Sequence, residues 1–405
     1  MRQPATDEAA LRFAAAAAAH RDGRLDQAEA GYRAVLRRMP RHGRALQNLG
    51  ALCRATGRRA EAMTLYRRAL AQDPGFDDVR LNLGNLLNDL DRHGEAETMF
   101  RHVLQRRPDE VKALFGLGYA LLGQQRDEAA VAVLGRLAEL APGHRTGLRY
   151  LAATLDRLGR AEASLAAYER LLALDPADPD VRYLVDARRG RTAARAPASF
   201  VTTLFDSFAP TFENSLRNQL DYRTPELLAG LLDRHAPPGR RLGRVVDLGC
   251  GTGLMGPLLR PRSEWLEGVD LSAAMLGQAA ARSCYDGLHC ADIVDFMQRP
   301  QPAFDLAVAA DVFVYLGDLA PILTAAAARL ATGGMLLFSV ELADAATDWR
   351  LQPTARFAHG PAYLARVAEA HGLAVLGRAT AAIRQERGCP VPGGLYLLHP
   401  ATRMG

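Results

Sequence analysis

The residues best suited to chemistry lie in one short stretch, residues 245–253, which reads Val-Val-Asp-Leu-Gly-Cys-Gly-Thr-Gly. Its apolar start predicts a buried strand. The alternating glycines, Gly249, Gly251 and Gly253, predict a tight turn that leads into a helix. Glycine lets the backbone approach a ligand where a Cβ atom would clash. Because open α/β sheets bind their ligands at the carboxyl ends of strands, we expect a binding site at this turn.

Two classes of ligand fit the turn. Residues 251–256, Gly-Thr-Gly-Leu-Met-Gly, also satisfy the glycine pattern of dinucleotide-binding proteins, so a nicotinamide cofactor must be considered. Asp247 argues against it, because a carboxylate beside the turn would repel a pyrophosphate. The sulfonium and amino groups of S-adenosylmethionine suit Asp247 instead.

Two further acids end the next two apolar segments. Asp270 closes residues 265–270 and lies 21 residues after Gly249, where a carboxylate can accept both ribose hydroxyls of either cofactor. Asp292 closes residues 288–292, and its carboxylate could accept the adenine amino group. Three acids that end three successive strands favour the methyl donor.

On these residues, the chain from Phe200 to Leu398 resembles the class I S-adenosylmethionine-dependent methyltransferases. The resemblance implies a Rossmann-like, seven-stranded domain and S-adenosyl-L-methionine as the cofactor. The residues implied to bind the cofactor are Asp247, Gly249, Cys250, Gly251, Gly253, Asp270, Leu271, Met275, Asp292, Ile293 and Ala310, with Phe205 and Tyr222 as parts of a lid.

The lid assignment comes from the segment 205–209, Phe-Asp-Ser-Phe-Ala. Many small methyltransferases carry a similar aromatic-Asp-x-aromatic-Ala segment ahead of the sheet, where it covers the cofactor. The alternative is that these aromatic side chains only dock the leading helix on the sheet.

Candidates for the acceptor side follow the fourth and fifth strands. Asp311 and Tyr315 lie after the fourth strand, in a loop without the Asn-Pro-Pro-Tyr or Pro-Cys motifs of enzymes that methylate planar amino groups or cytosine carbon. After the fifth strand we expect an irregular stretch, residues 341–361. Arg356 in it could anchor a carboxylate or phosphate, and His359 could be a general base or merely a helix cap. No cluster of metal ligands is present, so we expect no metal site.

The expected strands are residues 245–248, 266–269, 288–290, 304–309 and 335–340, with helices starting near residues 253, 273, 294 and 318. Alternating strands and helices predict a parallel, doubly wound sheet. Residues 374–380 and 395–398 are expected to close it as an antiparallel pair.

The first 180 residues repeat with a period of 34. Three positions of the repeat keep the same type of residue throughout, and we call each such position a column. The proline column is Pro40, Pro74, Pro108, Pro142 and Pro176. The aromatic or leucine column is Tyr32, Tyr66, Phe100, Leu134 and Tyr168, and the small-residue column is Ala28, Ala62, Ala96, Ala130 and Ser164. The period resembles that of tetratricopeptide repeats, which are pairs of antiparallel helices. The resemblance implies an all-α solenoid whose groove binds a protein or peptide partner, or one that only supports the catalytic domain.

Composition limits the remaining possibilities. The 405 residues are 49% hydrophobic and carry a net charge of +5, and 32 of the 50 basic residues fall within residues 1–200. A basic half could favour an acidic partner or RNA, although a solvated arginine-rich surface is favoured over nucleic-acid binding. Five scattered cysteines and no long apolar run predict reduced thiols, a cytoplasmic location and no membrane span.

We therefore expect a repeat array over residues 1–185, a linker over 186–199 and a methyltransferase domain over 200–405. Three functions remain open: an enzyme whose array recruits a protein or peptide substrate, a small-molecule methyltransferase whose array serves assembly, and a non-catalytic adaptor that binds cofactor. The acceptor atom and the oligomeric state are not predicted.

Overall fold

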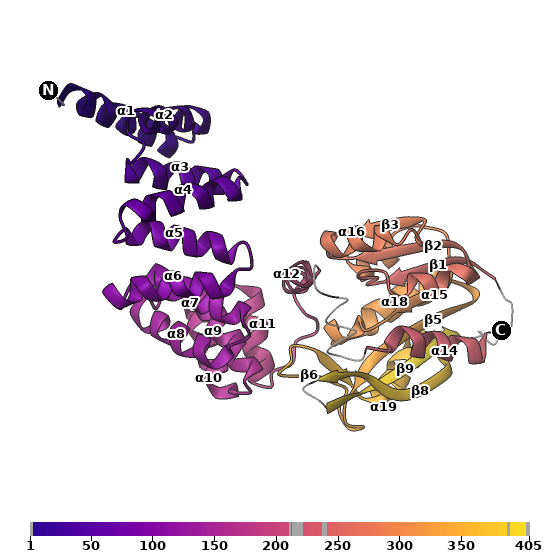
Figure 1. The fold of residues 1–405 in the computed structure, drawn as a ribbon. Coiled ribbons are helices and arrows are strands. Elements are labelled where there is room, and N and C mark those ends of the chain that lie inside the picture. Colours follow the sequence, from indigo (N-terminus) through magenta and orange to yellow (C-terminus); the bar gives the residue numbers. More distant parts are fainter. Residues whose placement is uncertain (1–2, 210–211, 213–221, 237–240, 387–388, 402–405) are drawn as a thin grey trace. The chain divides into compact units, whose positions relative to one another are not determined.

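The computed structural model describes residues 3–209, 212, 222–236, 241–386 and 389–401. The chain forms two compact units, Met1–Asp175 and Pro176–Gly405, and we describe each by itself. Figure 1 shows the helices of the first unit in indigo to magenta and the sheet of the second in orange to yellow. Part of the expected lid segment, residues 210–211 and 213–221, lies outside the described residues.

The first unit consists of five helix pairs, which confirms the predicted repeat array. The pairs are α1 (Gln3–Arg21) with α2 (Leu25–Arg38), α3 (Gly43–Ala55) with α4 (Arg59–Gln72), α5 (Asp77–Asn88) with α6 (His93–Arg106), α7 (Val111–Gly123) with α8 (Asp127–Leu140), and α9 (Arg145–Arg157) with α10 (Ala161–Leu174). The five periodic prolines fall between one pair and the next, because proline cannot continue a helix.

A glycine column on the first helices of the three middle repeats, Gly50, Gly84 and Gly118, packs against the aromatic or leucine column of the same repeats. A Cβ atom on Gly50 would lie 2.6 Å from the ring of Tyr66, and one on Gly84 would lie 2.7 Å from the ring of Phe100. Both rings are almost completely buried. The absence of a side chain on the first helix therefore makes room for the ring of the second, and this packing explains why both columns keep the 34-residue period.

One further column went unrecognised in the sequence. The residue that precedes each second helix is an arginine in every repeat, and two of these arginines illustrate its role. Arg58 donates to both carboxylate oxygens of Glu29, at 2.7 and 2.6 Å, and Arg126 lies 2.8 Å from Glu97. These exposed pairs contribute about 0.2–1 kcal/mol each. Part of the basic excess therefore joins neighbouring repeats. The column is Arg24, Arg58, Arg92, Arg126 and Arg160.

The second unit is built on a mixed sheet whose parallel part has the order β3-β2-β1-β4-β5. All the expected strands are present, and β9 joins β5 antiparallel with β8 beside it. The strands are β1 (Leu242–Leu248), β2 (Ser263–Asp270), β3 (Gly287–Cys290), β4 (Phe304–Ala309), β5 (Leu330–Leu342), β6 (Trp349–Leu351), β7 (Phe357–His359), β8 (Leu373–Glu386) and β9 (Cys389–Pro400). The order is that of the expected methyltransferase-like sheet.

The expectation of an irregular stretch over residues 341–361 was wrong. The short strands β6 and β7 lie inside it, and β7 pairs in parallel with the end of β5. Two three-residue strands were missed because a run this short carries too few residues to show an alternating pattern. Their effect is to place His359 on regular backbone beside the sheet, with Arg356 directly before β7.

Helices cover both faces of the sheet. One face, with Val246 and Leu248, packs against α17, α18 and α19, and the other, with Val245, packs against α14 and α15. The helices of this unit are α11 (Pro179–Arg188), α12 (Ala198–Phe208), α14 (Thr224–His235), α15 (Gly256–Leu259), α16 (Ala273–Ala281), α17 (Ile293–Gln298), α18 (Ala320–Arg329) and α19 (Pro361–Ala370), with 3-10 turns η1 (Arg260–Arg262) and η2 (Phe313–Tyr315).

The segment that was interpreted as a linker packs on the sheet unit. The backbone N–H of Ala196 donates to Tyr315 at 2.9 Å, and the N–H of Gly317 donates to Ala194 at 2.8 Å. Arg195 forms an antiparallel bridge with Leu316. Earlier in the chain, the hydroxyl of Tyr183 on α11 donates to the carbonyl of Ala355 at 2.9 Å. Most of helix α11 falls within the range expected for the array, residues 1–185, but the helix belongs to the unit that starts at Pro176.

Candidate functional site

The glycine turn lies where β1 ends. Gly249, Gly251 and Gly253 have φ angles of 69°, 54° and 83°, a region that residues with a Cβ atom rarely adopt. A Cβ atom on Gly251 would meet no atom within 4 Å, so the space beside this backbone is open. The turn is anchored on its other side, because the N–H groups of Gly249 and Cys250 donate to Val269 at 2.7 and 3.0 Å.

Asp270, at the end of β2, is attached to this turn. Its Oδ2 accepts from the N–H of Gly251 at 2.9 Å, and its Oδ1 accepts from the N–H of Ser272 at 2.8 Å. Each carboxylate oxygen has two acceptor positions, so both oxygens retain one. Burial raises the pKa of Asp270, and these backbone donors oppose the rise. The structure thus brings the predicted ribose acceptor onto the predicted glycine turn.

Asp247 is buried beneath the turn, with 1% of its surface exposed. The hydroxyl of Tyr285 donates to its Oδ2 at 2.7 Å. Burial raises the pKa of Asp247 to about 7, and the Tyr285 hydrogen bond opposes that rise. A carboxyl that is partly protonated at neutral pH repels a pyrophosphate only weakly. The charge argument against a dinucleotide therefore loses force, and the case for the methyl donor rests on Asp270, Asp292 and the sheet.

Asp292 caps α17, which starts at Ile293. Its Oδ1 accepts from the N–H groups of Val294 and Asp295 at 2.9 and 3.3 Å, and its Oδ2 pairs with the guanidinium of Arg195. Arg195 comes from the segment once interpreted as a linker, and no sequence signal marked it as a partner of Asp292.

The remaining predicted cofactor residues surround the turn with mostly apolar side chains. Met275 on α16 is fully buried, Cys250 and Ile293 are buried, and Leu271 and Ala310 are partly exposed. Leu271 follows β2 and Ala310 follows β4, so both lie at the carboxyl edge of the sheet with Asp270.

Two predicted lid residues lie against different neighbours. The ring of Phe205 on α12 meets the ring of Tyr315 edge-on, with centroids 5.6 Å apart. On the same helix, Asp206 accepts a hydrogen bond from the hydroxyl of Ser272 at 2.5 Å, which attaches α12 to the start of α16.

Tyr222, the second predicted lid residue, has a raised pKa. Burial, together with the Asp311 carboxylate, raises the pKa of Tyr222 well above its usual value, so Tyr222 lies near the acceptor candidates.

Asp311 belongs to a cluster of five charged residues, the acid–arginine cluster: Asp311, Glu341, Glu386, Arg356 and Arg384. Nη1 of Arg384 lies 3.0 Å from Asp311, its Nε lies 2.9 Å from Glu386, and its Nη2 pairs with Glu341. Arg384 is only 2% exposed. Three carboxylates against two arginines leave a formal charge of −1.

Two features hold this cluster in place. Asp311 has a φ of 59°, a strained conformation for a residue with a side chain, and its N–H donates to the hydroxyl of Ser339 at 2.8 Å. The amide of Gln352 donates to the second oxygen of Glu341 at 2.5 Å. Burial raises the pKa of Glu341, and Arg384 opposes that rise.

Arg356 enters the cluster from the segment before β7. Its Nη1 pairs with Glu386, and its side chain is 24% exposed. Burial acts to raise the pKa of Glu386, but Arg356 and Arg384 together lower it. Arg356 is therefore neutralised already, so binding a substrate anion would require it to leave or share Glu386.

His359 does not lie with these residues. It is fully buried, and its Nε2 lies 3.1 Å from the carbonyl of Gly317, while Nδ1 has no partner among the described residues. Burial lowers the pKa of His359 to about 4. A neutral, enclosed imidazole that contacts a backbone carbonyl suits a structural role better than proton transfer to a substrate.

Sequence reasoning missed Arg384, Glu341 and Glu386. A signal was available for two of them. Arg384 follows the run Ala-Thr-Ala-Ala-Ile, and Glu341 follows Leu-Leu-Phe-Ser-Val, so each is a charge at the end of an apolar strand. Such charges are rarely buried unless they are paired.

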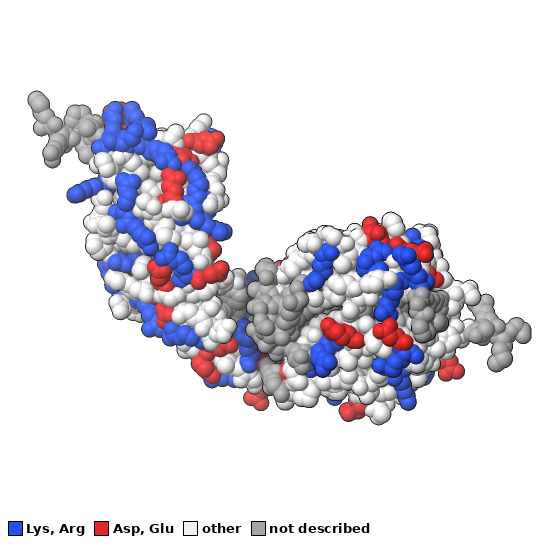
Figure 2. Space-filling model, turned by 45° about the vertical axis from the view of Figure 1, so that its right-hand side comes forward, with Lys and Arg blue, Asp and Glu red and all other residues white. Residues whose placement is uncertain are grey.

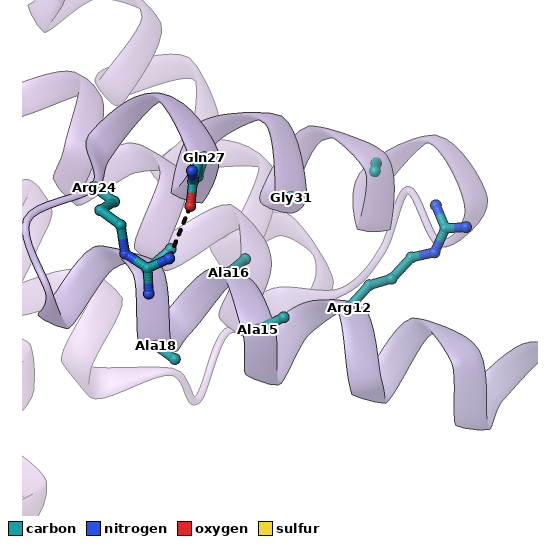
Figure 3. A pocket seen from close by; sticks show the side chains of 9 residues that line it. Arg12, Ala15, Ala16, Ala18, Arg24, Gln27 and Gly31 are labelled. Carbon is teal, nitrogen blue, oxygen red and sulfur yellow. Dashed lines mark hydrogen bonds between the residues drawn. The ribbon is translucent and has the colours of Figure 1, made fainter.

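The repeat unit contains a pocket that has no part in this site. About 500 Å³ lies between α1 and α2, lined by alanines, Gly31, Arg12 and Arg24, with Arg24 donating to Gln27 at 2.9 Å (Figure 3). Its lining offers no grouped nucleophiles or acids. Within the described residues, no group of three or more His, Cys, Asp or Glu side chains could hold a metal ion. No described helix is long and apolar enough to cross a bilayer.

Comparison with known protein families agrees with both units. Residues 220–377 match the methyltransferase domain model, residues 13–75 and 81–145 match one tetratricopeptide-repeat model, and residues 54–102 match another. The chain thus carries tetratricopeptide repeats followed by a methyltransferase domain.

Curated relatives that are named as methyltransferases match about a third of the chain. Methyltransferase-like protein 27 of Homo sapiens is 33% identical over 129 residues, 31% of this chain and 51% of that protein. Malonyl-(acyl-carrier protein) O-methyltransferase of Enterobacter lignolyticus is 29% identical over 37% of this chain and 57% of that protein. The chain therefore spans about half the length of these relatives.

Two solved structures of different kinds are each similar to part of the chain. An S-adenosylmethionine-dependent methyltransferase from Clostridium acetobutylicum is 17% identical, covers 49% of this chain and 100% of its own, and has a TM-score of 0.37. YrrB, described as a tetratricopeptide-repeat protein with an unusual peptide-binding site, is 18% identical, covers 41% of this chain and 86% of its own, and has a TM-score of 0.38.

Proposed function

We propose that this chain, in which tetratricopeptide repeats precede a methyltransferase domain, transfers a methyl group from S-adenosylmethionine to an acceptor that the repeat array recruits. The observation that carries the proposal is the hydrogen bond between Asp270 and Gly251. It joins the acid at the end of β2 to the glycine turn at the end of β1, so two parts of a nucleoside site form one surface.

The residues at this edge fit the cofactor. The open backbone of Gly251 accommodates a ligand, Asp270 keeps one acceptor position on each oxygen for the ribose hydroxyls, and Asp292 keeps one for the adenine amino group. Leu271, Met275 and Ile293 supply an apolar lining. When bound, the cofactor supplies an electrophilic methyl group on a good neutral leaving group.

The protein's own contribution is then mainly alignment. Asp311 lies at the end of β4 with its strained backbone held by Ser339 and its carboxylate held by Arg384. Tyr315, four residues later, packs against Phe205 on α12. We assign Asp311, Tyr315 and Arg356 to the acceptor side and His359 to support of the loop at Gly317.

The charge of the acid–arginine cluster favours particular acceptors. Because its three carboxylates outnumber its two arginines, a group that donates hydrogen bonds, such as an amine or a hydroxyl, binds there more favourably than another anion.

The array supplies a surface for recruitment. Figure 2 shows lysine and arginine side chains spread along one face of the array, with acids between them. Many arginines inside and outside the arginine column pair with acids of the array. Basic residues still outnumber acids in residues 1–200, and this excess favours an acidic protein or peptide. A small-molecule methyltransferase whose array serves assembly is the second candidate function, because the chain's relatives include O-methyltransferases named for ubiquinone biosynthesis.

The test is transfer of a labelled methyl group from S-adenosylmethionine to fractionated cell extract. We expect label in the protein fraction, stable to mild base because the acceptor is not a carboxylate. Label confined to the small-molecule fraction would favour the second candidate. Base-labile label would show that a carboxylate is methylated and would contradict the acceptor class.

A further inference from the structure

Residues 193–197, which we call the strap, lie across two loops at the carboxyl edge of the sheet. On one side the strap follows the loop after β4, through the hydrogen bonds of Ala196 to Tyr315 at 2.9 Å and of Gly317 to Ala194 at 2.8 Å. On the other side, Arg195 pairs with Asp292, which follows β3. One short segment thus joins the loops that end β3 and β4.

The same two loops carry residues of the proposed adenine end of the cofactor site. Asp292 and Ile293 follow β3, and Ala310 follows β4. Asp292 already accepts three donors, two from the backbone of α17 and one from Arg195, and only Oδ2 retains an acceptor position. A ligand amino group that uses this position must therefore lie beside the guanidinium of Arg195.

We infer that the strap forms the outer wall of the adenine subsite and that Arg195 fastens it, so that cofactor leaves only when the strap lifts. This inference rests on the proposed function, because it assumes that an adenine nucleoside occupies the edge marked by Asp270 and Asp292. It adds Arg195 and Ala196 to the residues that determine how long the cofactor stays bound.

The two attachments differ in strength, which makes the strap suited to opening. The side chain of Arg195 is 45% exposed, and ion pairs with that exposure are weak because water screens them. The backbone bonds to the β4 loop involve Ala196, which is only 2% exposed. The Arg195 end should therefore detach first, which frees the Asp292 side while the β4 side remains attached.

The chain contains its own reporter for this movement. Only two tryptophans are present, and Nε1 of Trp349 lies 3.4 Å from the carbonyl of Ala193 in the strap. The other, Trp265, is 44% exposed on β2. In a Trp265→Phe background, fluorescence of Trp349 should respond when the strap moves.

The test measures dissociation of S-adenosylhomocysteine from the full chain by stopped-flow fluorescence, with equilibrium affinity from calorimetry. Arg195→Ala should accelerate dissociation about two- to fivefold, as expected for the loss of an exposed ion pair. Arg195→Lys should restore most of the original rate because it keeps the charge. Ala196→Pro removes the N–H that donates to Tyr315 and should also accelerate dissociation. Arg191→Ala, an exposed arginine near Asp186, is the matched control and should leave the rate unchanged.

The outcomes separate this inference from the proposed function. Unchanged dissociation in both Arg195→Ala and Ala196→Pro, with tight binding retained, overturns the strap and leaves the proposed function intact. Failure of the wild-type chain to bind S-adenosylhomocysteine overturns the proposed function and the strap with it. If Arg195→Ala lowers the melting temperature but leaves the dissociation rate unchanged, Arg195 is only structural.

Discussion

Nη1 of Arg384 lies 3.0 Å from Oδ1 and 3.4 Å from Oδ2 of Asp311, a residue 73 positions earlier in the chain. Arg384 comes from β8, an antiparallel strand, and Asp311 from the loop after the parallel strand β4. The pair therefore ties the closing strand of the sheet to the proposed acceptor side. Because Arg384 is buried, the neighbouring carboxylates depend on it for their charge balance.

Replacing this arginine should destabilise the second unit strongly. Arg384→Met leaves Asp311 and Glu341 without their main cation, and breaking a buried pair in this way costs about 3–5 kcal/mol. Arg378→Met on the exposed side of the same strand should change stability by about 0.5 kcal/mol or less. Urea unfolding measures the free energy of unfolding of both variants. Equal decreases for the two would show that the buried ion pairs of Arg384 do not stabilise the unit.

The pH dependence of stability should reveal His359. Its pKa is lowered to about 4, so between pH 6.5 and pH 4 the unfolded chain binds more protons than the folded one. The stability that the protein has with a neutral His359 is thus fully present above pH 6.5 and is lost as the pH falls toward 4. At pH 5 the loss is about 2 kcal/mol, from 1.36 kcal/mol per pH unit.

The check is the difference in unfolding free energy between the wild type and His359→Gln, measured at pH 7.5 and 5.0. The carboxylates that titrate in the same pH range affect both proteins equally, so their effect on the unfolding free energy cancels in this difference. We expect this difference to shrink at pH 5.0. A difference that stays constant with pH would mean that His359 is not held neutral in the folded protein.

Packing within the repeats can be tested with two glycines of one repeat. Gly84→Ala would place its Cβ atom 2.7 Å from the ring of Phe100, and such overpacking costs about 1–3 kcal/mol. Gly94→Ala meets no atom within 4 Å and should stabilise helix α6 by about 0.4–1 kcal/mol. Thermal unfolding measures both variants. If both raise the melting temperature, or both lower it, the glycine–aromatic packing is contradicted.

The fold was largely predictable because its signals are periodic. The 34-residue spacing predicted five helix pairs, and apolar runs that end in acids predicted the parallel strands. The glycine turn and Asp270 were predicted as one site, and the structure joins them through the Gly251 N–H. Strands β6 and β7 were missed because they are too short to show a period.

The acceptor side was less predictable for a physical reason. Arg384, Glu341 and Asp311 are brought together by an antiparallel strand whose register no local pattern specifies. The strap was missed because alanine and arginine in a row indicate exposed chain. Its ordering comes from backbone hydrogen bonds to the β4 loop, which side-chain types do not reveal.

The unit boundary predicts how the chain can be divided. Residues 176–405 should fold and bind S-adenosylhomocysteine as tightly as the intact chain, because every proposed cofactor residue lies within them. Residues 199–405 lack Tyr183 and Arg195, so this fragment should melt several degrees lower and release the ligand faster. Equal melting temperatures for the two fragments would show that α11 and the strap do not support the sheet.

The most direct test of the central claim is a calorimetric titration of the full chain with S-adenosylhomocysteine and, separately, with NADH. We expect binding of the first and none of the second. Asp270→Asn, which removes the charged acceptor on the glycine turn, should weaken binding by about 1.5–3 kcal/mol, while Asp295→Asn on the exposed face of α17 should not. Binding of NADH alone, or an affinity for S-adenosylhomocysteine that Asp270→Asn leaves unchanged, would contradict the account.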